Sequence, residues 1–148
     1  MSELVRPVVW IHADCLSPQH PALLAYPGAP ALFVWDEALL SSLRISLKRI
    51  VFLYECLLEL PVSIRRGDVA AEVLAFASEQ QADGVVTSAS PSPRFAAISA
   101  QIAAQRPLRV LPVEPFVQIE QRLDLARFAR YWRAVEARAL NTFPEDTV

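Results

Sequence analysis

Short apolar runs alternate with longer amphipathic stretches along most of the chain. The runs are rich in β-branched residues, as in strands that are buried on both faces of a parallel sheet. The predicted strands are 5–12, 31–35, 62–65, 85–88 and 108–113, and the predicted helices are 21–26, 42–60, 69–81, 94–105 and 123–140. This alternation predicts an α/β fold, in which helices cover both faces of a mostly parallel sheet.

Composition predicts one folded domain. The chain has 148 residues, of which 53% are hydrophobic and 20% are charged, so a disordered chain is not expected. We expect the domain to span residues 1–140 and residues 141–148 to form a flexible tail, because the tail is polar. The mean hydropathy of +0.28 predicts a large core and is compatible with an additional apolar interface.

The net charge and the lengths of the apolar runs argue against nucleic acid and a membrane as partners. The net charge of −2 argues against autonomous binding to a nucleic-acid backbone, which needs a basic surface. No apolar run approaches the roughly 18 residues of a membrane span, and the N-terminus does not resemble a signal peptide. Cys15 and Cys56 show no metal-type spacing. The expectation is therefore a cytoplasmic protein with two reduced thiols.

Catalytic motifs are not apparent in the sequence. Its glycines are Gly28, Gly67 and Gly84, which form neither a dinucleotide fingerprint nor a P-loop. His12 and His20 have no partners at metal-ligand spacing, so no metal site is expected. Ser88, His12 and Asp14 supply the residue types of a hydrolase triad, but no nucleophile-elbow motif surrounds the serine. An independent enzyme is therefore the least favoured function.

Five segments carry a family resemblance. They read VVWIHADCLSPQHPAL, ALFVWDEALL, RIVFLYECLLEL, VSIRRGDVAAEVLAFASEQQADGVVTS and LARFARYWRAVEARAL. In this order and spacing, over roughly residues 5–139, the chain resembles the N-terminal, antenna-side domain of DNA photolyases and cryptochromes. Trp10, Asp14, Ala22 and Leu23 fit the opening pattern of that domain. His12 and Ala13 depart from it, because the family prefers arginines there.

This resemblance implies a Rossmann-like three-layer sandwich with a five-stranded parallel sheet in the order 3-2-1-4-5. It also implies a non-catalytic antenna-type module, since some relatives hold a folate or a deazaflavin in this domain. The flavin-binding domain of the family is not expected in this chain, so no FAD is expected to bind to it. The implied partner is a separately encoded flavin domain or a second copy, in photolyase-related DNA repair or light response. Two alternatives remain: a nucleotide-binding protein of the universal-stress type, and a relic without activity.

With that strand order, a ligand is expected at the switch point between the first and fourth strands. The candidate ligand-binding residues there are His12, Asp14, Cys15, Ser88, Ser90, Ser92 and Arg94, with Asp36 after the second strand. The hydroxyls, the arginine and a helix N-terminus would suit an anionic group, and Asp36 would suit a ribose-like hydroxyl. Alternatively, the two aspartates satisfy only loop backbone donors and the Ser/Pro loop only caps its helix.

Two helices carry candidate interfaces. On helix 42–60 we expect Leu43, Leu47, Ile50, Tyr54, Leu57 and Leu58 to face the core. The opposite face holds Ile45, Phe52 and Cys56 among charged residues, including Arg44. It is a candidate interface unless the helix is buried on both sides. Tyr131 and Trp132 stand among arginines on the last helix, as a second candidate interface or as part of a solvated face.

Overall fold

The computed structural model describes residues 4–42, 45–115, 117, 123 and 125–140. By its contacts the chain divides into two compact units, Met1–Val113 and Glu114–Val148. The first unit contains the sheet and the second contains one described helix. Each unit is described by itself below.

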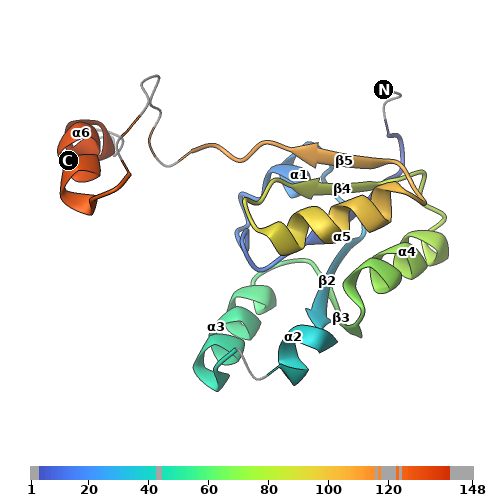
Figure 1. The fold of residues 1–148 in the computed structure, drawn as a ribbon. Helices are drawn as coiled ribbons and strands as arrows, with labels where there is room; N and C mark the ends of the chain where they lie inside the picture. Colours follow the sequence, from blue (N-terminus) through green and yellow to red (C-terminus); the bar gives the residue numbers. More distant parts are fainter. Residues whose placement is uncertain (1–3, 43–44, 116, 118–122, 124, 141–148) are drawn as a thin grey trace. The chain divides into compact units, whose positions relative to one another are not determined.

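The first unit is built on a five-stranded parallel sheet in the order β3-β2-β1-β4-β5 (Figure 1). The strands are β1 (Val8–Ile11), β2 (Ala31–Asp36), β3 (Ser63–Gly67), β4 (Val85–Ser88) and β5 (Leu108–Leu111). The predicted α/β class and the strand order that the resemblance implied are both confirmed.

Five helices connect the strands: α1 (Pro21–Ala25), α2 (Glu37–Ser41), α3 (Leu47–Leu58), α4 (Val69–Glu79) and α5 (Pro93–Ala103). One core cluster joins β1, β2 and β4 to α4 and α5 through residues such as Val73 and Ile102. The other cluster joins the opposite face of these strands to α1 and α3 through Ala22 and Leu57. Helices therefore cover both faces of the sheet, as expected for a three-layer sandwich.

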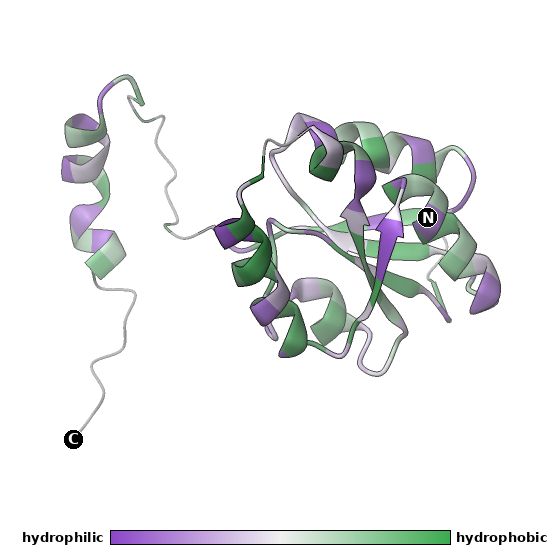
Figure 2. Cartoon of the chain, turned by 90° about the horizontal axis from the view of Figure 1, so that it is seen from below, coloured by the Kyte–Doolittle hydropathy of each residue, from purple (hydrophilic) through white to green (hydrophobic). Residues whose placement is uncertain are grey.

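The polarity of each strand matches its place in the sheet. All residues of β1 and β4 are buried, which explains their continuous apolar runs. The edge strand β3 instead carries Arg65 and Arg66, which pair with Glu79 and Glu37. In Figure 2 most of the central strands are coloured hydrophobic, whereas the helices carry residues of both kinds. The charged side chains of β3 also make its open edge a poor template for another strand.

The predicted helix 42–60 is wrong in its extent: the helix described within this range, α3, spans only Leu47–Leu58, and a separate short helix, α2, lies before it. The short helix α2 was not predicted, and it begins after Asp36, whose Oδ1 accepts a hydrogen bond from the Leu39 amide at 3.2 Å. A second cap, Ser46, accepts from the Arg49 amide and starts α3. A capping side chain favours a new helix start over continuation of the preceding one. Leu43 and Arg44 lie outside the described residues.

The predicted core-facing stripe of this helix is also wrong in part. Leu47, Tyr54 and Leu58 are 74%, 48% and 65% exposed, whereas Leu53 and Leu57 are buried. Leucine and tyrosine side chains occur on several sides of this helix, so spacing alone did not identify the buried side.

The second unit contains α6 (Phe128–Leu140), which begins five residues later than predicted. Val135 and Ala139 are buried, and the rings of Phe128 and Trp132 stack with centroids 6.0 Å apart. The expected tail, residues 141–148, lies outside the described residues. Among the helices that the structure describes, none is both long and apolar enough to cross a membrane.

Substitution of two glycines distinguishes close packing at the sheet, at Gly84, from an effect of backbone conformation alone, at Gly28. A Cβ at Gly84 would lie 2.8 Å from the carbonyl oxygen of Pro107 and 2.6 Å from Leu4. We expect Gly84→Ala to lower the free energy of unfolding by about 1–3 kcal/mol, measured by urea denaturation. Gly28 has φ +79° with open space around it, so Gly28→Ala should cost only about 1 kcal/mol of backbone strain. A Gly84 variant as stable as the wild type would contradict this packing.

Candidate functional site

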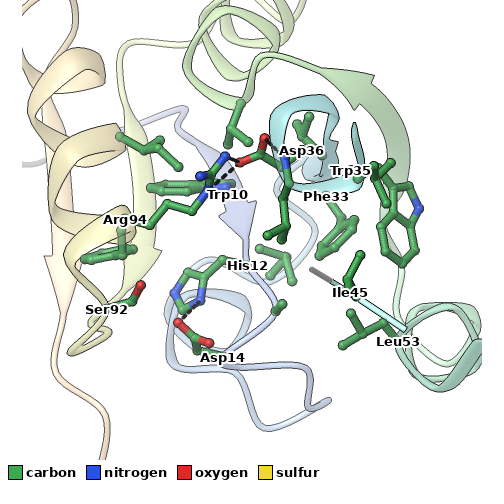
Figure 3. Close-up of a pocket in the computed structure, with 18 of the residues that line it drawn as sticks. Trp10, His12, Asp14, Phe33, Trp35, Asp36, Ile45, Leu53, Ser92 and Arg94 are labelled. Carbon is green, nitrogen blue, oxygen red and sulfur yellow. Dashed lines mark hydrogen bonds and ion pairs between the residues drawn. The ribbon is translucent and has the colours of Figure 1, made fainter. Parts of the chain in front are cut away.

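A cavity of about 250 Å³ opens at the carboxyl ends of β1 and β2 (Figure 3). Residues from the end of β1, the end of β2, α2, the segment leading into α3, α3 itself and α5 line it. Ligands of open parallel sheets bind at this edge, where the loops after the strands converge. The cavity lies over β1 and β2, rather than between β1 and β4 where the strand order had predicted a site.

Aromatic and aliphatic side chains form most of the wall. Trp10 and Phe95 stack with centroids 5.4 Å apart and planes 13° from parallel. On the other side of the sheet, Phe33 and Trp35 pack edge to face at 5.2 Å. Such rings provide flat apolar surface against which a planar ligand can stack.

An ion pair crosses the rim of the cavity. Arg94, in the first turn of α5, donates from Nε to Asp36 Oδ2 at 2.6 Å and pairs with the same oxygen through a second guanidinium nitrogen. The other carboxylate oxygen of Asp36 caps α2. The Asp36 side chain is only 13% exposed, whereas that of Arg94 is 48% exposed. Asp36 therefore fixes the position of two helices, and Arg94 is the more accessible partner.

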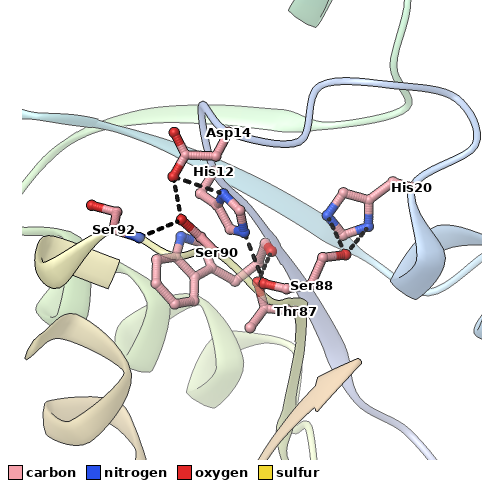
Figure 4. Close-up of polar contacts among 8 residues, drawn as sticks. His12, Asp14, His20, Thr87, Ser88, Ser90 and Ser92 are labelled. Carbon is pink, nitrogen blue, oxygen red and sulfur yellow. Dashed lines mark hydrogen bonds and ion pairs between the residues drawn. The ribbon is translucent and has the colours of Figure 1, made fainter. Parts of the chain in front are cut away.

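His12 carries an unused acceptor beside this cavity (Figure 4). Its Nε2 lies 2.9 Å from the carbonyl oxygen of Ser88, which can only accept, so Nε2 must carry the proton. Its Nδ1 has no hydrogen-bond partner among the described residues and lies 4.0 Å from Asp14 Oδ2. Burial lowers the pKa of His12, although the hydrogen bond to Ser88 and the charge of Asp14 partly oppose this shift. When the His12 ring is neutral, its Nδ1 and Asp14 Oδ2 are both acceptors, so no hydrogen bond can join them.

The Ser/Pro loop is held by its own hydroxyls. Ser90 donates to Asp14 and accepts from the Ser92 amide at 3.1 Å. The Ser92 side chain, in contrast, makes no capping hydrogen bond to α5. The expectation that this loop only caps its helix is therefore not met, because the Ser90 hydroxyl instead bonds Asp14 and the loop itself.

His20 and Ser88 form a fully buried pair beneath the site. His20 Nδ1 accepts from the Ala22 amide at 3.1 Å and so caps α1. Its Nε2 must then carry the proton, and it lies 3.1 Å from Ser88 Oγ. Burial lowers the pKa of His20 to about 4, with a smaller effect from His12. Burial also raises the pKa of the Cys15 thiol, so this thiol is a poor nucleophile at neutral pH.

This arrangement does not form a hydrolase triad. His12 donates to the main chain of Ser88 rather than accepting from its hydroxyl, and the serine is buried. His20 donates to that hydroxyl, so it does not act as its general base. The described residues also contain no group of three or more His, Cys, Asp and Glu side chains arranged to hold a metal ion.

The structure brings part of the predicted site together. The cavity is lined by His12, Asp14, Asp36, Ser92 and Arg94, whereas Cys15, Ser88 and Ser90 do not line it. The last two support the site through hydrogen bonds to His12, His20 and Asp14.

The structure also shows how exposed the predicted interface residues are. Ile45 was predicted at an interface, but it precedes α3, so helical spacing does not apply to it, and it lines the cavity. Phe52 is 61% exposed, which contradicts the alternative of a helix buried on both sides. Cys56, Tyr131 and Trp132 are half-buried.

Sequence reasoning missed the apolar wall and Arg49. Phe33 and Trp35 directly precede Asp36 at a strand end, which was an available signal for the wall. Arg49 was missed because the sequence pattern assigned the wrong side of its helix to the core.

The buried His20 and the partly buried His12 predict a pH-dependent stability. In the unfolded chain a histidine has a pKa of about 6.5, whereas His20 has a pKa of about 4 in the fold. The unfolded state therefore binds more protons between these values, and stability is full above pH 6.5 and decreases as the pH falls. We expect the free energy of unfolding to decrease by about 2 kcal/mol from pH 7.5 to pH 5 through His20, with an addition of the same sign from His12. Chemical denaturation at a series of pH values measures this.

The matched variant is His20→Asn, because an asparagine can cap α1 without titrating in this range. It should remove most of the pH dependence between pH 7.5 and pH 5 and leave the part that His12 contributes. Depressed carboxylate pKa values, such as that of Glu79, act mainly below this window. An unchanged slope in the variant would contradict the role given to His20.

No protein-family model matches this sequence, and no curated protein matches it either. The functional argument therefore depends on the geometry of the site.

Proposed function

We propose that this chain is a non-catalytic binding module that holds a compact, planar, nitrogen-rich ring system in the cavity over β1 and β2. The observation that carries this proposal is the aromatic-lined cavity with an unsatisfied acceptor, His12 Nδ1, beside the carboxylate of Asp14. Within the kinds of ligand expected from the resemblance, a folate-type or deazaflavin-type chromophore and a nucleotide all have such a ring.

Size and lining favour a small flat ligand. Ligand pockets typically measure about 300–1,000 Å³, so a cavity of about 250 Å³ suits one ring system with its substituents rather than an extended molecule. The stacked pair Trp10 and Phe95 offers apolar surface at one wall, and Phe33 and Trp35 offer it at another. Burial of such a ring against aromatic side chains is the expected source of most of the affinity.

The polar groups favour a ligand that donates hydrogen bonds. His12 Nδ1 and Asp14 Oδ2 are both acceptors and lie 4.0 Å apart. One amino group of a ligand can donate to both at once, as an exocyclic amine on a heteroaromatic ring would. Binding would thereby satisfy a buried nitrogen that has no partner among the described residues.

The family assignment is part of the same proposal. The confirmed strand order agrees with what the resemblance to photolyase and cryptochrome antenna domains implied, although many α/β proteins share that order. On this assignment the chain would be an antenna-type module that works with a separately encoded flavin domain in DNA repair or light response. Recovery of a flavin protein with the tagged chain from its host would support that partner.

The second candidate is a nucleotide-binding protein of the universal-stress type. One observation favours it: no side chain caps the N-terminus of α5, and Ser92 and Arg94 at this N-terminus both line the cavity. First-turn N–H groups and an arginine are suited to a phosphate. For Arg94 to bind a phosphate, its ion pair with Asp36 would have to be exchanged for one with the ligand.

The test is calorimetric titration of the purified chain with a deazaflavin, a folate, adenosine and AMP. Binding of at least one of these amino- or imino-bearing rings is expected, and Asp14→Asn should weaken it about ten-fold, since the variant loses a charged acceptor. Glu59→Gln is the matched control: it removes the same charge from the exposed residue that follows α3, which does not line the cavity. No binding of any of the four compounds would contradict the proposal.

Arg94→Met separates the two candidates. If AMP binds much more tightly than adenosine, and Arg94→Met removes that difference, the nucleotide-binding function is favoured. If a chromophore binds and Arg94→Met changes its affinity by less than about three-fold, the antenna-type function is favoured. The Arg94 side chain is about half exposed, so the variant is expected to fold.

A further inference from the structure

Helix α3 presents an apolar stripe to solvent beside its buried side. Leu53 and Leu57 are buried, and Leu57 belongs to the core cluster on this face of the sheet. The exposed stripe consists of Leu47, Val51, Tyr54 and Leu58, which are 74%, 47%, 48% and 65% exposed. Single exposed apolar side chains are ordinary, but four on one face of a helix form a continuous patch that is typical of a contact surface.

The spacing of this stripe is that of a two-helix seam. Its members follow one another at intervals of four, three and four residues. This is the alternating spacing of the apolar positions in a coiled coil, where each side chain packs between residues of a facing helix. The stripe runs along the whole of α3, from its first residue, Leu47, to its last, Leu58. A second helix of similar length is therefore the partner that matches this surface.

Charged residues beside the stripe indicate which helix is the partner and whether it runs parallel or antiparallel to α3. Lys48 and Glu55 lie seven residues apart on the same side of the stripe, with the lysine near the N-terminus of α3 and the glutamate nearer its C-terminus. Neither forms an ion pair with a described residue. If two copies of α3 packed in parallel, these charges of the two copies would lie on opposite sides of the seam and would not meet. If they packed antiparallel, each Lys48 would face Glu55 of the other copy.

We propose that α3 is the dimer interface of this protein and packs antiparallel against α3 of a second copy about a two-fold axis. Leu47 then lies opposite Leu58 of the second copy, and Val51 lies opposite Tyr54. Such an interface is self-complementary: both the apolar stripe and the two ion pairs are generated by the same residues on each side. Phe52 lies on the outer, charged side of α3 and is peripheral to this seam.

The test is a charge exchange read by the dimer dissociation constant, measured by sedimentation equilibrium. Wild type should be a dimer, and Val51→Lys should weaken it at least 100-fold, because two lysines would enter the seam. Lys48→Glu and Glu55→Lys should each weaken the dimer about ten-fold, since each leaves two like-charge contacts. The double variant Lys48→Glu/Glu55→Lys should restore it. Residues 48 and 55 are two turns apart on one helix, so the restoration cannot come from a contact within α3.

The controls separate this interface from loss of fold. Leu24→Lys places the same charge on an apolar residue of α1 that is 59% exposed, and it should not change the dimer. Circular dichroism and thermal melting should show every variant folded, because each position is exposed.

A monomeric wild type would overturn the proposal, whether the stripe is bare or covered by another part of the same chain. A dimer that is indifferent to Val51→Lys would overturn it as well. Failure of the double variant to restore the dimer would overturn the antiparallel arrangement.

Discussion

The junction at the end of β4 is the interaction on which the site depends. Ser88 is fully buried, and both histidines of the chain donate to it, His12 to its carbonyl oxygen and His20 to its hydroxyl. These bonds fix the tautomer of each ring. They place the free acceptor of His12 toward Asp14 and let His20 cap α1. Because buried polar groups are costly when unpaired, the end of the sheet is built around this shared serine.

The same junction supports the proposed binding function. Its serine is buried, its histidines act as donors toward that serine, and its Cys15 thiol has a raised pKa. What reaches the cavity is a set of flat apolar walls, an acceptor pair and the Arg94–Asp36 ion pair. In the proposed function these features orient the ligand. None of the site residues named above is an activated nucleophile.

Much of the fold could be predicted from the sequence, because apolar run lengths and turn residues identify strands of a parallel sheet directly. The strand order came from the family resemblance, and the structure confirms it. The polar members of the site followed from their positions after strand ends, as for Asp14 and Asp36. The short helix α2, the later start of α3 and the side that α3 buries could not be predicted. Leucines occur on several sides of α3, and the caps at Asp36 and Ser46 give only local signals. Because the buried side of α3 was assigned incorrectly, neither the position of Arg49 at the cavity nor the exposed stripe was predicted.

The most direct measurement of the central claim uses the three tryptophans as reporters. Trp10 and Trp35 line the cavity, and Trp132 lies on α6 in the other unit. Indole N–H signals in a ¹⁵N–¹H spectrum can be followed while a heteroaromatic ligand is added. The account predicts saturable shifts of the Trp10 and Trp35 signals. Shifts confined to Trp132, or none with any of the proposed ligand classes, would contradict a binding site over β1 and β2.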